Sequence, residues 1–316
     1  MNFTTPITIP KNNFPIDFSS EIITLGSCFS DSMGVKFKHY KFSVNANPFG
    51  VIFNPISIEK LIKRAVDVDW FTENDLVYHQ ELWHSFDVHS DFSSTDKSLM
   101  LNQLNSTLKD FVEYLKSASH CYITFGSAWV YVENQSNQVV SNCHKFPQIN
   151  FKKKLLSVDE IEKSVKATIA LIKHINSTCN LIFTVSPVRH IKDGFVENQR
   201  SKSHLITAIH NCISSNNNYF PSFEIMIDEL RDYRFYASDM LHPSQIALDY
   251  IWEKFSISSI DTKLKDILLE IDSIQKSLAH RAFNPATESH KKFLKNLDSK
   301  IQKLQSIHPK INFSYE

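Results

Sequence analysis

The chain has 316 residues and 42% of them are hydrophobic, which is enough for a sizeable core. Basic and acidic side chains balance at 34 each, so no overall field attracts nucleic acid or an anionic membrane. No apolar run approaches the roughly 18 residues that span a bilayer, and the N-terminus lacks a signal-peptide pattern, which predicts a cytoplasmic protein. Five scattered cysteines, never in C-x-x-C spacing, predict reduced thiols.

Strand-like and helix-like patterns alternate along the chain. Apolar, β-branched or aromatic runs predict strands at 21–25, 41–46, 121–125, 180–185 and 218–227, of which 41–46 is the weakest. Helical spacing of apolar residues marks 57–67 and 97–118, and Ser157 with Glu160 forms a capping box that opens a helix ending near Ile175. The alternation predicts a three-layer α/β/α fold with a central, mostly parallel sheet.

Three segments depart from this alternation. Residues 75–92 and 129–142 carry hairpin-like polar and aromatic patterns, which we interpret as insertions near a site. Apolar residues then recur at helical spacing over 264–278 and again over 294–304, with Pro285 between them. This predicts a main domain at 1–260 and a C-terminal helical hairpin at 261–316, whose stripes pack together and then against the body or a second subunit of a homodimer.

Glycines follow three of the predicted strands. Gly26, Gly50 and Gly126 are three of only five glycines in the chain. Ligands of open parallel sheets bind beyond the carboxyl ends of the strands, and a glycine there permits positive φ and close approach of backbone to a ligand. Gly26 also delivers Ser27 to the first turn of a helix, where free N–H groups stabilise an oxyanion.

A serine nucleophile needs a base, and the segment YASDMLHPS supplies a candidate. Asp239 and His242 are three residues apart, about one helical turn, and Pro243 starts the next helix. The carboxylate can fix the imidazole tautomer while the imidazole takes the serine proton. Ser27, Asp239 and His242 therefore form a candidate acyl-transfer triad.

The order of these blocks resembles the SGNH (GDSL-type) hydrolases. The motifs LGSCFS, NPFGVIFNP, ITFGSAWVY, NCHKFP, TVSPVRHIKDG and the long stretch from Tyr219 to Ser244 resemble more closely the GSCFA branch of that superfamily, over residues 20 to about 258. The resemblance implies Ser27 as nucleophile, Asp239 and His242 as its triad partners, and oxyanion donors from the backbones of Ser27 and Gly50. We expect neither a metal nor another cofactor.

The sequence departs from the superfamily at its third block. Where that block reads Gly-x-Asn-Asp, this chain has Gly126, Ser127, Ala128 and Trp129, so the asparagine donor to the oxyanion is missing. The hydroxyl of Ser127 or the amide of Asn142 can replace it. Substrate contacts are expected from residues beside the predicted strand ends and insertions, namely Asn47, Trp129, His84 and Arg189.

Each of these features has a simpler alternative. Gly26 and Ser27 alone fit an ordinary helix N-cap, and Cys28 is an alternative nucleophile because a helix N-terminus lowers a thiol pKa. His84, Asp87 and His89 are metal-binding types, but alternation along a strand would point His84 and Asp87 to opposite faces. For Arg189 and the adjacent His190, a role in binding substrate or ordering the site is weighed against an ion pair with an acidic neighbour such as Asp193.

The sequence is compatible with three functions of different classes. The leading one is a serine hydrolase or acyltransferase acting on a small-molecule or carbohydrate ester through an acyl-enzyme. The second is a non-catalytic module that binds a carbohydrate or acyl ligand in the same cleft, because the third-block asparagine is missing. The third is a scaffold whose function resides in the C-terminal hairpin.

Overall fold

A five-stranded parallel sheet forms the centre of the computed structural model, which describes residues 4–213, 217–280 and 283–313. Its strand order is β10-β9-β5-β1-β2, and each neighbouring pair is parallel. The strands are β1 (Glu21–Gly26), β2 (Ser43–Ala46), β5 (His120–Phe125), β9 (Asn180–Val185) and β10 (Asn217–Phe220). The predicted parallel sheet is confirmed, including the weak strand that became β2.

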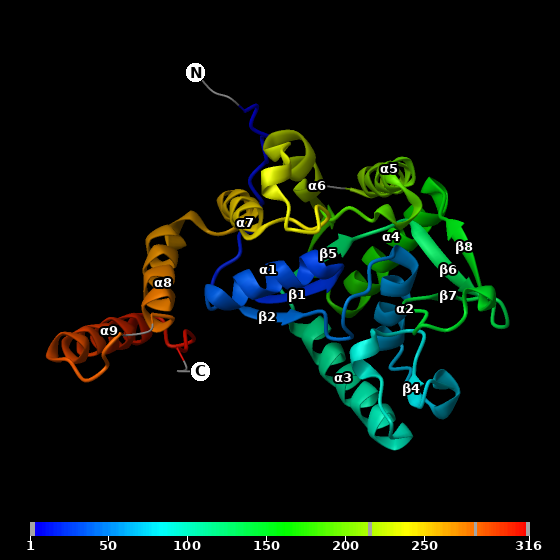
Figure 1. The fold of residues 1–316 in the computed structure, drawn as a ribbon, viewed down its shortest axis with the longest axis horizontal. Helices are drawn as coiled ribbons and strands as arrows, with labels where there is room; N and C mark the ends of the chain where they lie inside the picture. The colour runs from blue at the N-terminus through cyan, green and yellow to red at the C-terminus, as the bar shows by residue number, and fades with distance from the viewer. Residues whose placement is uncertain (1–3, 214–216, 281–282, 314–316) are drawn as a thin grey trace.

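Helices cover both faces of this sheet (Figure 1). On one face, Ile22 and Tyr122 pack with Phe255 and other residues of α1 (Cys28–His39) and α7 (Gln245–Ser259). On the other, Ile23 and Ile123 pack in the larger core, whose helices are α2 (Pro55–Val66), α3 (Lys97–Ser117), α4 (Val158–Ile175) and α5 (Phe195–Cys212). Successive strand residues point to opposite layers, as the pleat requires, so the α/β/α prediction is confirmed.

The strand predicted at 218–227 is only half correct. β10 ends at Phe220, and the chain then forms α6 (Ser222–Glu224) and a π-helical turn, η5 (Ile225–Leu230). Pro221 has no N–H to extend the strand ladder. The apolar residues that follow are buried on the inner side of the helical segment, with Ile225 and Met226 both fully enclosed. Because the apolar run is continuous, the hydrophobic pattern did not indicate where the strand ends and the helical segment begins.

The two insertions form small antiparallel sheets. β3 (Val77–His79) and β4 (Leu82–His84) make a hairpin. β6 (Trp129–Glu133) pairs with β7 (Val139–Val140) and with β8 (Phe151–Leu155), a strand that the sequence did not suggest because three consecutive lysines occupy its centre. Short helical turns complete the order: η1 (Glu73–Asp75), η2 (Ser90–Phe92), η3 (Gln148–Asn150), η4 (Ile191–Asp193), η6 (Tyr233–Phe235) and η7 (Thr262–Leu264).

The C-terminal hairpin consists of α8 (Lys265–Leu278) and α9 (Glu288–Ile307). Its two apolar stripes pack together, with Ile271 and Ile274 against Leu297 and Ile301, and Phe18 and Tyr40 of the body join this cluster. The predicted helices and their mutual packing are confirmed, whereas a homodimer stays a prediction. α8 and α9 lie at one end of the long axis, and β6 to β8 lie at the other (Figure 1). Within the described ranges, no helix is both long and apolar enough to cross a membrane.

Candidate active site

Ser27, Gly50 and Ser127 follow strands that end where the strand order reverses, whereas no hydrogen bond joins Ser27 to His242 among the residues that the structure describes. β1 runs on to β2 on one side, and the chain later returns to place β5 on the other, so the carboxyl ends of β1 and β5 flank a switch point. The loop after β2 closes this point, because Ile52 N–H donates to the Gly26 carbonyl at 2.9 Å and Gly126 N–H donates to the Phe53 carbonyl at 2.8 Å. The glycine-bearing ends of β1, β2 and β5 therefore share one edge.

Position 26 requires a glycine because β5 lies too close to leave room for a side chain. The φ of Gly26 is +131°, and a Cβ at this position would lie 2.0 Å from the Thr124 carbonyl oxygen. Asn47 holds the same turn, since its Oδ1 accepts the Gly26 N–H at 2.7 Å and its Nδ2 donates to Asp31 at 2.6 Å. Asn47, which we expected to contact substrate, is instead committed to shaping the turn that precedes Ser27.

Ser27 caps helix α1. Its Oγ accepts the Phe29 N–H at 3.2 Å, and the residue is 1% exposed. Its own N–H donates to the Thr124 carbonyl at 3.1 Å, and the Gly50 N–H donates to the Asn47 carbonyl at 2.7 Å. The structure thus leaves neither of the two predicted oxyanion N–H groups free. The turn at Gly26 brings the Ser27 N–H within bonding distance of β5, and the Gly50 N–H is bound within the loop after β2.

Asp239 and His242 form a hydrogen-bonded pair. Asp239 Oδ2 lies 2.6 Å from His242 Nδ1, and Oδ1 accepts the N–H groups of His242 and Leu241 at 3.0 and 2.9 Å. These bonds from His242 and Leu241 lower the pKa of Asp239 to about 2. The His242 side chain is 49% exposed, and its Nε2 has no hydrogen-bond partner within the part of the chain that the structure describes.

The loop that carries this pair is attached to the same edge of the sheet as Ser27. Arg189, just after β9, donates its N–H to the Leu241 carbonyl at 3.1 Å. Its guanidinium lies over the ring of Tyr236, 3.9 Å from the centroid. Asp193 pairs with Lys153 instead, so the ion-pair alternative for Arg189 is wrong. Arg189 braces the Asp239 loop, which is the site-ordering reading.

His190 occupies the space beside Gly126 and Ser27. Its Nε2 lies 3.1 Å from the position that a Cβ on Gly126 would take, and the Ser27 Cβ lies 3.3 Å from that same position. The imidazole stacks on Phe53 with a centroid distance of 5.9 Å. Burial, with the positive charges of Lys202 and His242, lowers the pKa of His190 to about 3. The sequence indicated only a general role for this residue.

Lys202 is a buried amine that the sequence analysis missed. Its Nζ donates to the carbonyls of Gly126 and Ser186, each at 2.7 Å, and so joins the ends of β5 and β9. Burial lowers the pKa of Lys202 to about 7. The signal was present, because Lys202 lies three residues before Leu205 on the apolar face of α5.

The two proposed replacements for the missing asparagine differ. Ser127 is buried. Its Oγ lies 3.2 Å from Ser201 Oγ and accepts the Trp129 N–H at 3.0 Å. Asn142 accepts the His144 N–H through Oδ1 and lines a cavity beside the site. The hydroxyl of Ser127 is therefore engaged, whereas the amide nitrogen of Asn142 has no partner among the residues described.

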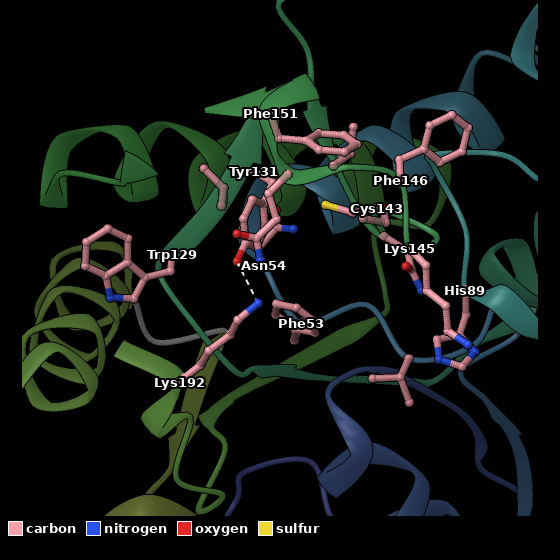
Figure 2. A pocket seen from close by; sticks show the side chains of 16 residues that line it. Phe53, Asn54, His89, Trp129, Tyr131, Cys143, Lys145, Phe146, Phe151 and Lys192 are labelled. Atoms are coloured by element: carbon pink, nitrogen blue, oxygen red, sulfur yellow. Dashed lines mark hydrogen bonds between the residues drawn. The ribbon is translucent and has the colours of Figure 1, made fainter. Parts of the chain in front are cut away.

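That cavity has a volume of about 380 Å³ and lies between the loop after β2, the β6 to β8 sheet and η4 (Figure 2). Lys192 donates to the Tyr131 hydroxyl at 3.4 Å across it. Phe53 lines the cavity and also stacks on His190, so the cavity adjoins the candidate site. Its aromatic and charged lining comprises Phe53, His89, Trp129, Tyr131, Lys145, Phe146, Phe151 and Lys192.

Of two residues expected to contact substrate, Trp129 lines the cavity and His84 does not. Trp129 lines the cavity, and its indole N–H donates to the Glu197 carbonyl at 3.3 Å. His84 is 6% exposed and is held between Ser93 Oγ at 2.7 Å and the His79 carbonyl at 3.1 Å. It does not line the cavity, so the expected substrate contact of His84 finds no support in this arrangement.

The remaining alternatives concern Cys28 and a metal. Burial and the nearby Asp31 raise the pKa of the Cys28 thiol, so it is protonated at neutral pH. Asp87 binds Lys60 and His89 binds Asp91. Across the described residues, no group of three or more His, Cys, Asp or Glu side chains is placed to hold a metal ion.

Comparison with known proteins identifies the family. Residues 21–255 match the GSCFA family, and residues 271–316 match the C-terminal domain of GSCFA domain proteins. No curated protein matches the chain. The first match spans the central sheet, Ser27 and the Asp239 loop, and the second covers most of the helical hairpin. The chain therefore belongs to the GSCFA family.

Proposed function

We propose that the protein is a serine hydrolase of the SGNH type that cleaves esters through an acyl-enzyme. The observation that carries the proposal is the Asp239 and His242 pair at 2.6 Å, on a loop tied by Arg189 to the sheet edge where Ser27 begins α1. The carboxylate orients the imidazole through Nδ1 and leaves Nε2 for the serine proton. Ser27 Oγ accepts a bond from Phe29, which leaves its own proton available to a base.

The proposed reaction has two halves. His242 Nε2 takes the Ser27 proton as Oγ bonds to the ester carbonyl carbon, and Asp239 stabilises the imidazolium that forms. The imidazolium then gives its proton to the departing alcohol, which leaves an acyl group on Ser27. A water molecule, deprotonated by His242, attacks the acyl carbon, and the carboxylic acid leaves as Ser27 recovers its proton. A second alcohol in place of water would make the protein an acyltransferase.

The cavity beside Phe53 supports a substrate with a ring. Aromatic faces from Trp129, Tyr131 and Phe151 line it together with the amide of Asn142, a combination that suits an O-acylated carbohydrate or another hydroxylated ring. Its lining contains no carboxylate. In this proposal the cavity receives the part of the ester that does not react, and the acyl carbon lies near Ser27.

One observation favours a second function, that of a non-catalytic binding module. Ser27 is 1% exposed, and the N–H groups of Ser27 and Gly50 already donate to carbonyls. An active site in this form must open before Ser27 meets a substrate. A module that only binds a carbohydrate or acyl ligand would need no such change.

Hydrolysis of p-nitrophenyl acetate separates the two functions. The hydrolase predicts release of p-nitrophenol by the wild-type protein, loss of at least about 1000-fold in kcat for Ser27→Ala and His242→Ala, and a smaller loss for Asp239→Asn, which keeps the imidazole in place. The exposed cap variant Ser157→Ala is the control. Equal rates for the wild-type protein and Ser27→Ala would contradict the hydrolase.

A further inference from the structure

The imidazole of His190 lies near Ser27, and the proposed mechanism gives it no role. Its Nε2 is buried and has no hydrogen-bond partner among the residues that the structure describes. A buried polar atom without a partner is costly and rare in native proteins. Such an atom at the edge of a candidate active site indicates a partner that arrives with the substrate.

The position of this atom is defined by its neighbours. Nε2 lies 3.1 Å from the point where a Cβ on Gly126 would be, and Ser27 Cβ and Phe53 Cβ lie 3.3 and 2.7 Å from the same point. Gly126 has no room for even a methyl group, and its lack of a side chain lets the imidazole and the carbon that carries the nucleophile both lie within 3.3 Å of one point. Phe53 stacks on the imidazole and also lines the cavity, so the imidazole lies near both Ser27 and the cavity.

The surroundings of His190 favour a neutral imidazole. Burial lowers the pKa of His190 to about 3, and the nearby Lys202 and His242, both cationic when protonated, add to this effect. Its backbone N–H donates to Asn198 at 2.9 Å, which fixes the residue between η4 and α5. An imidazole with so low a pKa is a poor base, but its ring N–H can donate a hydrogen bond to developing negative charge.

On the basis of the proposed function, we propose that His190 Nε2–H is an oxyanion donor that replaces the asparagine missing from the third block. The N–H groups of Ser27 and Gly50 donate to carbonyls, and the Ser127 hydroxyl is bound to Ser201. Asn142 keeps an amide nitrogen without a partner among the residues described but lines the adjoining cavity, whereas His190 Nε2 and Ser27 Cβ lie near the same point beside Gly126. When an ester enters the opened site, its carbonyl oxygen approaches His190 and accepts the bond that Nε2 lacks. The bond strengthens as the oxygen gains charge in the transition state.

The test compares His190→Phe and His190→Gln in ester hydrolysis. Phenylalanine keeps a ring against Phe53 but removes the donor, so kcat falls about 100-fold to 1000-fold while KM changes by less than about threefold. Glutamine restores an N–H and recovers at least about tenfold of that loss. The matched control is His174→Phe, at the exposed end of α4 on the amino edge of the sheet, and it leaves kcat unchanged.

A second measurement separates this role from simple packing. Because His190→Phe removes a buried polar atom that has no partner, its melting temperature equals or exceeds that of the wild-type protein by up to a few degrees. Loss of kcat together with a lowered melting temperature would show a packing role and overturn the proposal. So would a kcat for His190→Phe within about threefold of wild type.

These outcomes are distinct from failure of the proposed function. If the wild-type protein and Ser27→Ala hydrolyse the ester equally, the hydrolase is wrong and the role of His190 falls with it. If Ser27→Ala is inactive but His190→Phe is fully active, the hydrolase stands and only the oxyanion donor is wrong.

Discussion

At the scale of single residues, the site is built from groups whose protonation is set by burial. The Cys28 thiol and the Lys202 amine are both displaced toward their neutral forms by desolvation, and Asp239 is kept ionised by donated hydrogen bonds. The sequence located Asp239 and His242, because two residues three positions apart on one loop must lie close together. It could not show that Ser27 is enclosed, because burial depends on β5 and on the loop after β2, which are distant in sequence.

Replacing Cys28 tests the identity of the nucleophile. Cys28→Ala keeps hydrolysis within about threefold of wild type, because a thiol with a raised pKa contributes little thiolate at neutral pH. Ser27→Ala loses the activity. Steady-state kinetics of both variants check the assignment. An inactive Cys28→Ala beside an active Ser27→Ala would identify the cysteine as nucleophile.

At the scale of elements, strand ends position the chemistry. The alternation of strands and helices was predictable, because fully buried strands such as β5 and β9 are continuous apolar runs bounded by turns. β8 was not predictable, because its three central lysines give no apolar pattern and the strand forms by pairing with β6. The helical segment after Pro221 was misread because a short continuous apolar run fits a buried strand and a buried helix equally well.

The turn between β1 and α1 is expected to tolerate no side chain at Gly26. In Gly26→Ala the new Cβ meets the Thr124 carbonyl oxygen at 2.0 Å, and the φ of +131° adds strain. We expect a loss of at least about 2 kcal/mol in the free energy of unfolding. Gly194→Ala is the matched control, since φ there is +95° with no atom within 4 Å, and strain alone costs about 1 kcal/mol. Equal losses in urea unfolding would show that contact with β5 is unimportant.

The bridge that Lys202 makes between β5 and β9 predicts a pH dependence. Its pKa is about 7 in the folded protein and about 10.4 in an unfolded chain, so between these values only the unfolded chain holds the proton. Stability therefore rises with pH across this window, by up to about 1.4 kcal/mol per pH unit, and the gain is complete above the unfolded pKa. Relative to Lys202→Met, the wild-type protein should gain stability in urea unfolding between about pH 7 and about pH 10. A difference that stays constant would contradict the burial of a neutral amine.

At the scale of the whole molecule, the C-terminal hairpin extends the core beyond the α/β body. Phe18 and Tyr40 belong to the apolar cluster of α8 and α9, and His39 binds Asp272. Periodicity alone predicted the two helices and their contact, because both stripes repeat at helical spacing. It left open whether they cover the body or a second subunit, since a stripe does not identify its partner.

Truncating Ile274 tests whether the hairpin unfolds together with the body. Ile274 is 1% exposed, and Ile274→Ala should cost about 2 to 5 kcal/mol and lower the midpoint of a single thermal transition. Leu269→Ala on the same helix, where the leucine is 63% exposed, should cost less than about 0.5 kcal/mol. An additional early transition with an unchanged main one would show that the hairpin unfolds independently.

The central claim is that Ser27 is an activated nucleophile beside the Asp239 and His242 pair. Its most direct test is covalent labelling of the folded protein with a fluorophosphonate, followed by peptide mass spectrometry. The account predicts a single adduct on Ser27, absent from Ser27→Ala, slowed at least about 100-fold in His242→Ala, and retained in Cys28→Ala. No adduct on the folded wild-type protein, or an adduct that persists in Ser27→Ala, would contradict it.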